Sequence, residues 1–303
     1  MSSTPPHKFR TISEFQAFRQ LPKPQHPLVS LVDVATIKLS ESEPASIVND
    51  FYTIALKRIH SGKMKYGQQE YDFDEGTMFF ISPGQVYSIG ADRDLLHSGW
   101  VLLIHPDFLW NTKLAKTISH YAFFGYSVHE ALFLSEKEDT VITGILKNID
   151  QEYRSNIDNF SQDIIIAQLE LLLSYADRFY HRQFLTRKIA NHHVLEQLEN
   201  ILANYFSSEE LRSTGLPTVQ YVANELNISP NYLSGLLKVL TGQSTQQHIH
   251  DKLIEKAKER LSTTTLSVSE IAYELGFEHS QSFSKLFRTK TNFSPLEFRQ
   301  AFN

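Results

Sequence analysis

The sequence contains no cysteine. It therefore has no disulfide, no thiolate metal site, no iron–sulfur cluster and no thiol redox chemistry. No apolar run approaches the roughly 20 residues that a membrane-spanning helix needs. Residues 1–10 are polar and have no apolar core of a signal peptide. We therefore expect a cytoplasmic protein with no membrane partner.

The chain also has little excess of one charge over the other. The 303 residues carry a formal net charge of −5, which is unusual for a protein that binds nucleic acid. This value is an average over the whole chain, and beyond Gly215 the basic residues are about as numerous as the acidic ones. The length allows two domains, and a hydrophobic content of 41% supports two buried cores. An interface with nucleic acid would depend on where a few cations lie.

The C-terminal part of the chain contains a repeat. Between the two copies, apolar residues correspond to apolar residues and basic residues to basic residues. The turn residues of the two copies favour the same backbone conformation. Each copy predicts a helix, a sharp turn and a second helix, which is a helix-turn-helix unit. The corresponding residues are Val219, Val222, Ala223, Leu226, Leu233, Leu236, Leu237 and Lys238 in the first copy, and Val268, Ile271, Ala272, Leu275, Phe283, Leu286, Phe287 and Arg288 in the second.

The turn residues support this prediction. Asn227 and Gly276 stand where the chain must turn sharply, and both residue types tolerate a left-handed backbone conformation. The Ser229-Pro230 pair is typical of the start of a helix. We expect Gly242 and Asn292 to end the two second helices in the left-handed conformation. The second copy has one extra residue in its turn.

The second helix of each copy leaves a polar strip opposite its apolar stripe. The strip residues recur at the spacing i, i+3, i+4 and i+7, so each strip is continuous along its helix. Amide side chains can bond adenine edges, and Lys or Arg can bond guanine or phosphate. An ordinary amphipathic helix shows the same polar face to water, and the repeat with its matched turns is what favours DNA binding. The strips are Asn231, Ser234, Gly235 and Lys238, and Gln281, Ser284, Lys285 and Arg288.

Residues from about Leu216 to Asn303 resemble the DNA-binding domain of the AraC/XylS family of bacterial transcription regulators. The most specific stretches are Ser269-Glu270-Ile271-Ala272, Leu275-Gly276-Phe277, Ser282–Arg288 and Ser294-Pro295. The resemblance implies that a long helix through Ile249 to Leu261 joins the units rigidly and that the second helices enter successive major grooves. Carried over by position, the base-reading candidates are Asn231, Ser234 and Gly235 in unit one, and Ser280, Gln281, Ser284 and Lys285 in unit two.

Two residues depart from the family's pattern. Asn292 stands where the family usually has glycine, and Asn can adopt the left-handed conformation that the position needs. Gly235 stands where a large polar side chain is common, and it presents nothing to a base. It also destabilises its helix by roughly 0.5–1 kcal/mol relative to alanine. We therefore expect unit one to contribute positioning and one contact from Asn231, and unit two to read more of the sequence.

Residues 27–104 predict a set of short β-strands. They are rich in β-branched and aromatic residues and are separated by turn signals such as Pro83-Gly84. Short strands at this spacing predict a small antiparallel barrel or sandwich. The order of the turns resembles the cupin-like sensory domain of many AraC-family members. The expected strands are Leu28–Leu39, Phe51–Ile59, Glu70–Phe73, Met78–Ser82, Val86–Ile89 and Ser98–Ile104.

Metal chemistry is not expected in this region. Metal-dependent cupins use a His-x-His pair, a Glu and a further His, but here Asn49 and Tyr87 stand near the expected ligand positions. The His-x-His pair of the chain, His248 and His250, falls on the predicted linker helix, where residues two apart point in different directions. His60, His97 and His105 are isolated. We expect no enzyme activity, no cofactor and no bound metal.

Aromatic residues are frequent on the predicted strands. They suit the wall of a small-molecule pocket, but half of the side chains of any strand face the core in any case. The pattern identifies neither an effector nor the residues that bind it. The aromatic residues are Tyr52, Tyr66, Tyr71, Phe79, Phe80, Tyr87 and Trp100.

Helical periodicity begins at Ser135. One apolar stripe contains Val141, Ile145 and Ile149, a second runs through residues 165–176, and residues 156–159 separate them, which predicts an antiparallel helical hairpin. The resemblance implies that these helices form a homodimer; the alternative is that they only cover the sheet. We predict an α+β protein. Residues 1–185 form an N-terminal cupin-like antiparallel β barrel or sandwich with following helices, and residues 186–303 form an all-α tandem helix-turn-helix domain.

Together these features predict a sequence-specific DNA-binding transcription regulator. We expect double-stranded DNA, a small-molecule effector or partner at the N-terminal domain, a second copy of the chain and RNA polymerase as partners. Two alternatives remain: a ligand-binding or enzymatic cupin whose helical domain is an interaction module, and an architectural DNA binder without a ligand. Saturable, salt-sensitive binding of duplex DNA by residues 190–303 would argue against the first, and a thermal-shift response to metabolites against the second.

Overall fold

The computed structural model describes residues 6–37, 44, 46–59, 64–66, 69–71, 76–87, 97–127, 130–155, 160–186, 188–208, 211 and 214–301. The chain divides into two compact units, Met1–Gln183 and Phe184–Asn303. Among the helices of the described residues, none is both long enough and apolar enough to cross a bilayer.

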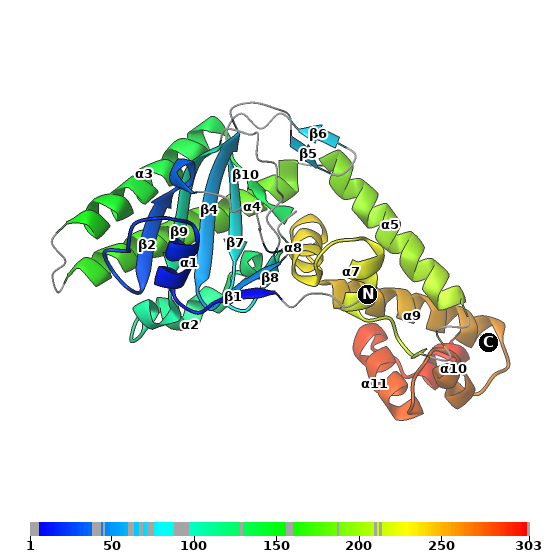
Figure 1. Ribbon diagram of the computed structural model, residues 1–303. Coiled ribbons are helices and arrows are strands. Elements are labelled where there is room, and N and C mark those ends of the chain that lie inside the picture. Colours follow the sequence, from blue (N-terminus) through cyan, green and yellow to red (C-terminus); the bar gives the residue numbers. More distant parts are fainter. Residues whose placement is uncertain are drawn as a thin grey trace. The chain divides into compact units, whose positions relative to one another are not determined.

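The strands of the first unit form three sheets (Figure 1). They are β1 (His7–Phe9), β2 (Val29–Asp33), β3 (Ile47–Asn49), β4 (Tyr52–Ile59), β5 (Met64–Tyr66), β6 (Gln69–Tyr71), β7 (Thr77–Ile81), β8 (Val86–Tyr87), β9 (His97–Ile104) and β10 (Leu132–Phe133). The largest sheet has the order β10-β7-β4-β9-β2 and is antiparallel throughout. A second sheet has the order β1-β3-β8, and β5 pairs with β6.

The first unit also contains four helices among its described residues. They are α1 (Ile12–Phe18), α2 (Leu114–Thr117), α3 (Glu136–Arg154) and α4 (Ser161–Thr186), with 3-10 turns at Val34–Thr36, Pro106–Leu109, Ile118–His120 and Ala122–Gly125. Thr11 and Glu14 form a capping box that begins α1, and Ser135 and Glu138 form one that begins α3. The capping box satisfies two backbone N–H groups that a helix start otherwise leaves without partners.

The two faces of β4 show how the core is arranged. Side chains alternate across a strand, and Ala55 packs in one hydrophobic cluster with Phe9, Ile47 and Tyr87 of the smaller sheet. On the other face, Arg58 donates hydrogen bonds to Asp139 of α3, with an Nη2–Oδ2 distance of 2.7 Å. The smaller sheet and α1 therefore cover one face of the large sheet, and α3 covers the other.

The fold confirms a β-sheet region followed by helices, and it differs from the prediction in some details. The described sheets do not close into a barrel, so of the two predicted alternatives, barrel or sandwich, the barrel is not confirmed. The antiparallel prediction is wrong for one pair, because β1 pairs with β3 in parallel. The first expected strand ends at Asp33, because its Oδ1 accepts a hydrogen bond from the N–H of Ala35 and starts a 3-10 turn. The aromatic residues of the strands lie in different parts of the core, since Phe80 packs with Phe123, whereas Tyr87 lies in the cluster around Ala55.

The apolar stripes of the two long helices are close to those predicted. Ile145 and Ile149 of α3 are buried, but Ile142 is buried instead of Val141, which is 36% exposed. Periodicity alone does not decide which of two adjacent apolar residues faces a sheet. On α4 the stripe from Ile165 to Ala176 is buried as predicted. The expected connection at residues 156–159 lies outside the described residues.

The second unit is all helical. Its helices are α5 (Lys188–Ser207), α7 (Val219–Glu225), α8 (Pro230–Thr241), α9 (Thr245–Thr263), α10 (Val268–Glu274), α11 (Ser280–Thr291) and α12 (Pro295–Gln300). One hydrophobic cluster contains buried residues from α5 and from every helix from α7 to α11. Figure 1 shows α9 between the α7–α8 pair and the α10–α11 pair. A shared core holds the two pairs in one arrangement, because close-packed interiors deform little.

The predicted turns of the repeat are confirmed. Asn227 and Gly276 have φ of 55° and 80°, and the C-caps Gly242 and Asn292 have φ of 77° and 63°. Ser229 caps α8 by accepting a hydrogen bond from the N–H of Tyr232, and Pro230 takes the first helical position. The extra residue in the second turn puts His279 at the N-cap of α11, where its side chain makes no capping hydrogen bond.

Candidate DNA interface

The polar strip of α8 is partly exposed. Asn231 and Lys238 at its two ends are exposed, whereas Ser234 and Gly235 between them are half-buried. The Ser234 hydroxyl lies 3.2 Å from the hydroxyl of Thr245, the first residue of α9. This hydrogen bond ties the middle of α8 to α9. The exposed polar groups of the α8 strip are therefore one amide and one ammonium group, about two helical turns apart.

The strip of α11 carries more exposed polar side chains. Gln281, Lys285 and Arg288 are exposed, and Ser280 and Ser284 are half-buried. The opposite face of α11 holds Phe283 and Phe287, both fully buried, with ring centroids 5.8 Å apart. Burial of these rings fixes the rotation of α11 about its axis. The strip of α11 therefore shows one amide, one ammonium and one guanidinium group to solvent.

The cations of the two strips differ from the other cations that follow Gly215. Lys238, Lys285 and Arg288 make no ion pair with any carboxylate among the described residues. Other cations are engaged: Lys252 with Glu255, Lys256 with Glu259, Arg260 with Glu274 and Lys290 with Asp251. Lys258 lies over the Phe298 ring, and Arg299 donates to the Leu261 carbonyl. Among the described cations that follow Gly215, those without a carboxylate partner therefore lie on α8 and α11.

One carboxylate links the two helix-turn-helix units. Asp251 on α9 accepts a hydrogen bond from Gln243 through Oδ2 at 2.9 Å and pairs with Lys290 through Oδ1 at 2.8 Å. Gln243 follows α8, and Lys290 lies in the last turn of α11. The partners are 8 and 39 residues from Asp251 along the chain, and sequence analysis missed them because no local spacing relates them. The link adds a polar constraint to the apolar core between the two units.

The two histidines of the pair on α9 have different hydrogen-bond neighbours. His248 Nε2 lies 2.9 Å from the Thr241 hydroxyl, whereas His250 Nε2 lies 2.9 Å from the Gln246 amide nitrogen. The two rings therefore have different neighbours, as their spacing predicted. His105 instead begins a 3-10 turn, where its Nδ1 accepts from the N–H of Asp107 at 3.2 Å. Within the described residues no group of three His, Asp or Glu side chains could hold a metal ion.

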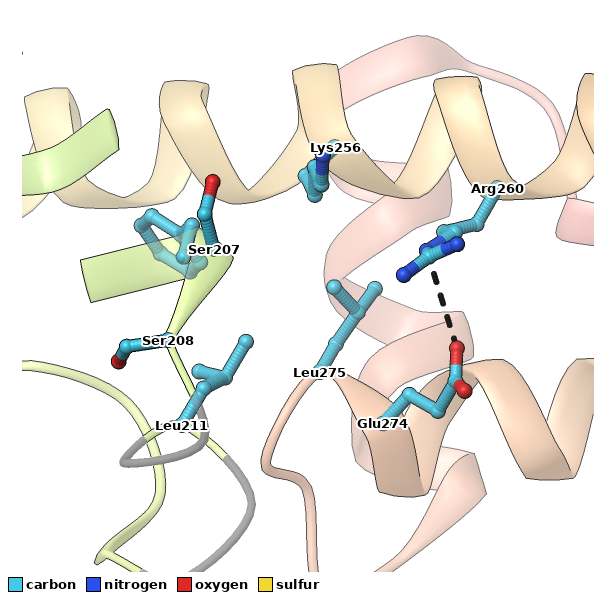
Figure 2. A pocket seen from close by; sticks show the side chains of 8 residues that line it. Ser207, Ser208, Leu211, Lys256, Arg260, Glu274 and Leu275 are labelled. Carbon is cyan, nitrogen blue, oxygen red and sulfur yellow. Dashed lines mark ion pairs between the residues drawn. The ribbon is translucent and has the colours of Figure 1, made fainter. Parts of the chain in front are cut away.

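A cavity of about 280 Å³ lies elsewhere in the second unit, between the end of α5, α9 and α10. Figure 2 shows Lys256 and Arg260 projecting from α9, opposite Glu274 and Leu275. Arg260 Nε lies 3.7 Å from Glu274 Oε2, and Lys256 Nζ lies 2.8 Å from Glu259 Oε2. Each cation thus has a carboxylate neighbour, so the charges of this cavity are balanced, unlike those of the strips.

Comparisons with known proteins agree with this architecture. Residues 222–301 match the family model described as "Helix-turn-helix domain". Over 258 residues the chain is 38% identical to the HTH-type transcriptional activator RhaS of Shigella dysenteriae serotype 1, which covers 83% of this chain and 86% of that protein. Over 256 residues it is 33% identical to RhaS of Enterobacter sp. (strain 638), with the same two shares.

Among solved structures, the C-terminal domain of the two-component response regulator yesN from Fusobacterium nucleatum is 29% identical. That match covers 35% of this chain and 98% of the other, with a TM-score of 0.31. The similarity to the RhaS proteins is the broader one, because it extends far beyond the repeat. The chain therefore belongs to the AraC/XylS family and is a DNA-binding transcription regulator rather than an enzyme.

Proposed function

We propose that this protein activates transcription by binding paired half-sites in promoter DNA, under the control of a small-molecule effector at its N-terminal unit. The observation that carries the proposal is the charge distribution of the second unit: Lys238, Lys285 and Arg288 lie on the two strips without a carboxylate partner among the described residues. The word activator comes from the names of the two RhaS relatives.

In this proposal α8 and α11 lie in successive major grooves. Asn231 and Gln281 read adenine edges, and Lys285 reads guanine, because these pairings match the donors and acceptors of the base edges. Lys238 and Arg288 bond phosphates and hold each helix in register. Four small residues of the strips are half-buried and let the helix surface approach the bases closely. They are Ser234, Gly235, Ser280 and Ser284. The second unit then discriminates more strongly than the first.

The few free cations set the salt dependence of binding. The slope of log K against log salt is about −0.9 for each phosphate neutralised on B-DNA. The two phosphate-bonding cations, Lys238 and Arg288, predict a slope of about −2 for one chain and about −4 for two. We therefore expect weak binding to random DNA and stronger reliance on base contacts than in a highly basic regulator.

We propose that residues 1–185 sense the effector and dimerise, and that residues 186–303 bind DNA. The exposed face of α4 supports the dimer. Ile164, Ala167 and Leu171 of α4 are exposed at the spacing i, i+3 and i+7, and Phe160, directly before α4, is exposed as well. They make an apolar stripe of the kind that packs against a second helix. Leu171→Glu is expected to convert a dimer into a monomer in analytical ultracentrifugation, and an unchanged sedimentation coefficient would contradict this role of α4.

The remaining parts of the proposal follow from the family. The N-terminal unit is cupin-like in the order of its strands and turns and binds the effector between its sheets. The protein works in the cytoplasm, where its DNA is, and contacts RNA polymerase at the promoter. A dimer raises affinity for paired half-sites through effective concentration, without any new base contact.

Affinity selection of fragmented genomic DNA by the full-length protein, followed by sequencing, tests the proposal. Wild-type protein should recover intergenic fragments that share a motif with two half-sites. The double variant Gln281→Ala/Lys285→Ala should recover a degenerate motif, whereas Lys252→Ala, which removes one cation already paired with Glu255, should recover the wild-type motif. Recovery of random fragments by wild-type protein, with and without metabolite extract, would overturn the proposal.

A further inference from the structure

The last turns of α4 are bonded to the edge of the large sheet. The side-chain amide of Gln183 accepts a hydrogen bond from the N–H of Phe133 at 2.8 Å and donates one to the carbonyl oxygen of Ala131 at 3.1 Å. Arg182 donates to the carbonyl oxygen of Phe133 at 2.7 Å and pairs with Glu138 of α3. We call these contacts of Arg182 and Gln183 the α4 clamp.

The α4 clamp covers backbone groups of β10, the strand at one end of the large sheet. Gln183 is 1% exposed, and its amide pairs with an acceptor and a donor two residues apart, in the manner of a neighbouring strand. Protection of a sheet edge is a common reason for such cover. The contacts of the next residue of α4 indicate a second role.

That next residue, Phe184, packs against a helix of the second unit. It is 3% exposed, and its ring lies edge-to-face on Tyr232 of α8, with ring centroids 5.1 Å apart and an interplanar angle of 79°. The boundary between the two compact units thus falls between Gln183 and Phe184, inside α4. Domain boundaries usually fall in flexible linkers, but α4 contains neither glycine nor proline. One continuous turn of helix therefore joins the α4 clamp to the contact with Tyr232.

Tyr232 lies in the first turn of α8, beside the proposed base-reading residue Asn231. Its N–H donates to the hydroxyl of Ser229, which caps the helix, at 3.2 Å. Tyr232 is half-buried, whereas Asn231 is exposed. Consecutive residues point about 100° apart around a helix axis, so the direction of the Tyr232 side chain also determines that of Asn231. A Tyr232 ring held by Phe184 therefore limits how the start of α8 can turn.

We propose that Phe184 positions the base-reading start of α8 and that the α4 clamp holds Phe184 in place for this task. The inference rests on the proposed function, in which Asn231 reads a base edge, and it adds a positioning residue that lies outside both helix-turn-helix units. In the repeat, Ser282 of α11 takes the position of Tyr232 and carries no ring. Base reading by α11 is therefore an internal control.

The test is a selection from a pool of random duplex DNA by the full-length protein and its variants, followed by sequencing. Asn231→Ala identifies the base positions that α8 reads, because preference falls there. Gln281→Ala/Lys285→Ala identifies in the same way the positions that α11 reads. The preference of every other variant is then compared with that of wild type at these two sets of positions.

The variants change adjacent residues of α4. Phe184→Ala removes the ring, Phe184→Leu keeps an apolar side chain without the ring, and Gln183→Leu keeps a side chain of similar size without its two hydrogen bonds to the sheet edge. The matched control is Leu185→Ala, because Leu185 follows on the same helix and is 50% exposed.

Phe184→Ala is expected to reduce preference at the α8 positions about fivefold, the lower limit for one base contact. Phe184→Leu should give a smaller loss at the same positions, and Gln183→Leu a loss in the same direction. All three should keep the wild-type preference at the α11 positions, and Leu185→Ala should keep it at both sets. A protein that does not fold loses both sets together, so a loss confined to α8 reports positioning.

A double variant, Gln183→Leu/Phe184→Ala, shows whether the α4 clamp acts through Phe184. It should lose no more preference at the α8 positions than Phe184→Ala alone, and losses that add would overturn the inference. Wild-type preference at the α8 positions in Phe184→Ala, or equal losses at both sets of positions in Phe184→Ala and Phe184→Leu, would also overturn it and leave the proposed function intact. A wild-type protein that selects no motif, or an Asn231→Ala protein with the wild-type motif, would instead contradict the proposed function or its use of Asn231, and the inference with it.

Discussion

Replacing Gly276 with alanine is expected to destabilise the second helix-turn-helix unit through two separate effects. Gly276 has φ of 80°, a left-handed conformation that side chains with a Cβ adopt at a cost. A Cβ at this position would also lie 2.8 Å from the Leu211 carbonyl oxygen and 3.0 Å from Cα of Gly215. Both neighbours are backbone atoms, so a side-chain rotation cannot relieve the contact.

The size of the effect follows from these two terms. The left-handed conformation costs about 1–2 kcal/mol for a residue other than glycine, and forcing an extra methyl into a packed site costs about 1–3 kcal/mol. The reduced freedom of the unfolded chain offsets about 0.4–1 kcal/mol. The net loss is therefore about 3 kcal/mol, which lowers the urea midpoint by about 1–2 M for an m-value of about 2 kcal/mol/M.

Urea unfolding of the full-length protein measures this effect with two probes. Tryptophan fluorescence reports on the first unit, which holds both tryptophans, and far-UV circular dichroism adds the helices of the second unit. Only the circular dichroism transition should shift in Gly276→Ala. The matched control is Asn227→Ala in the first turn. Asn227 has φ of 55° and already carries a Cβ, so this change tests conformational strain without a new contact.

We expect Asn227→Ala to lose about 1 kcal/mol and Gly276→Ala to lose clearly more. The valine variant Gly276→Val should lose more still, because a branched side chain adds further contacts. A Gly276→Ala protein whose circular dichroism transition coincides with that of wild type would refute the described turn. Equal losses for Gly276→Ala and Asn227→Ala would refute the steric part of the reasoning.

Three further predictions concern the DNA-binding unit. Asp251→Asn removes the ion pair with Lys290 and should weaken binding to paired DNA sites of fixed spacing by about 2–5-fold, since a partly exposed pair contributes up to about 1 kcal/mol. Equal affinities of the variant and wild type in fluorescence anisotropy would show that the link is dispensable. Gln281→Ala/Lys285→Ala should relax discrimination between specific and random duplexes, at about 1–3 kcal/mol for each contact, and unchanged discrimination would remove these residues from the interface. Hydrogen bonds from Ser267 lower the pKa of Glu270 from its usual 4.5. The folded-state pKa is therefore lower than the unfolded-state pKa, so the ionised carboxylate stabilises the fold above pH 4.5. This stabilisation is lost as pH falls through the folded-state pKa. Glu270→Gln should therefore show a smaller loss of stability in acid, and identical acid profiles would contradict the cap.

The helix-turn-helix units were predictable from local sequence. Asn227, Gly276, Ser229 and the C-caps act through their own backbone conformations or through neighbours a few residues away, so their roles are visible in the chain itself. The capping box of Thr11 and Glu14 was equally readable and would have revealed α1. The rotation of α11 followed from the spacing of Phe283 and Phe287, because a helix buries residues at fixed intervals.

Other features were decided by contacts between distant parts of the chain. The parallel pairing of β1 with β3, the burial of Ile142 in place of Val141 and the half-buried state of Ser234 depend on which surface packs against each element. Local periodicity cannot report these contacts.

The sequence by itself thus determined the two helix-turn-helix units, their turns and the polar strips that they carry. Only the tertiary structure decided which cations remain without carboxylate partners, that Asp251 links the two units, and that Gln183 bonds to the edge of the large sheet. The physical reason is the range of the interactions. Caps, turns and helix faces are set within a few residues, whereas ion pairs and buried polar contacts exist only after distant segments have packed together.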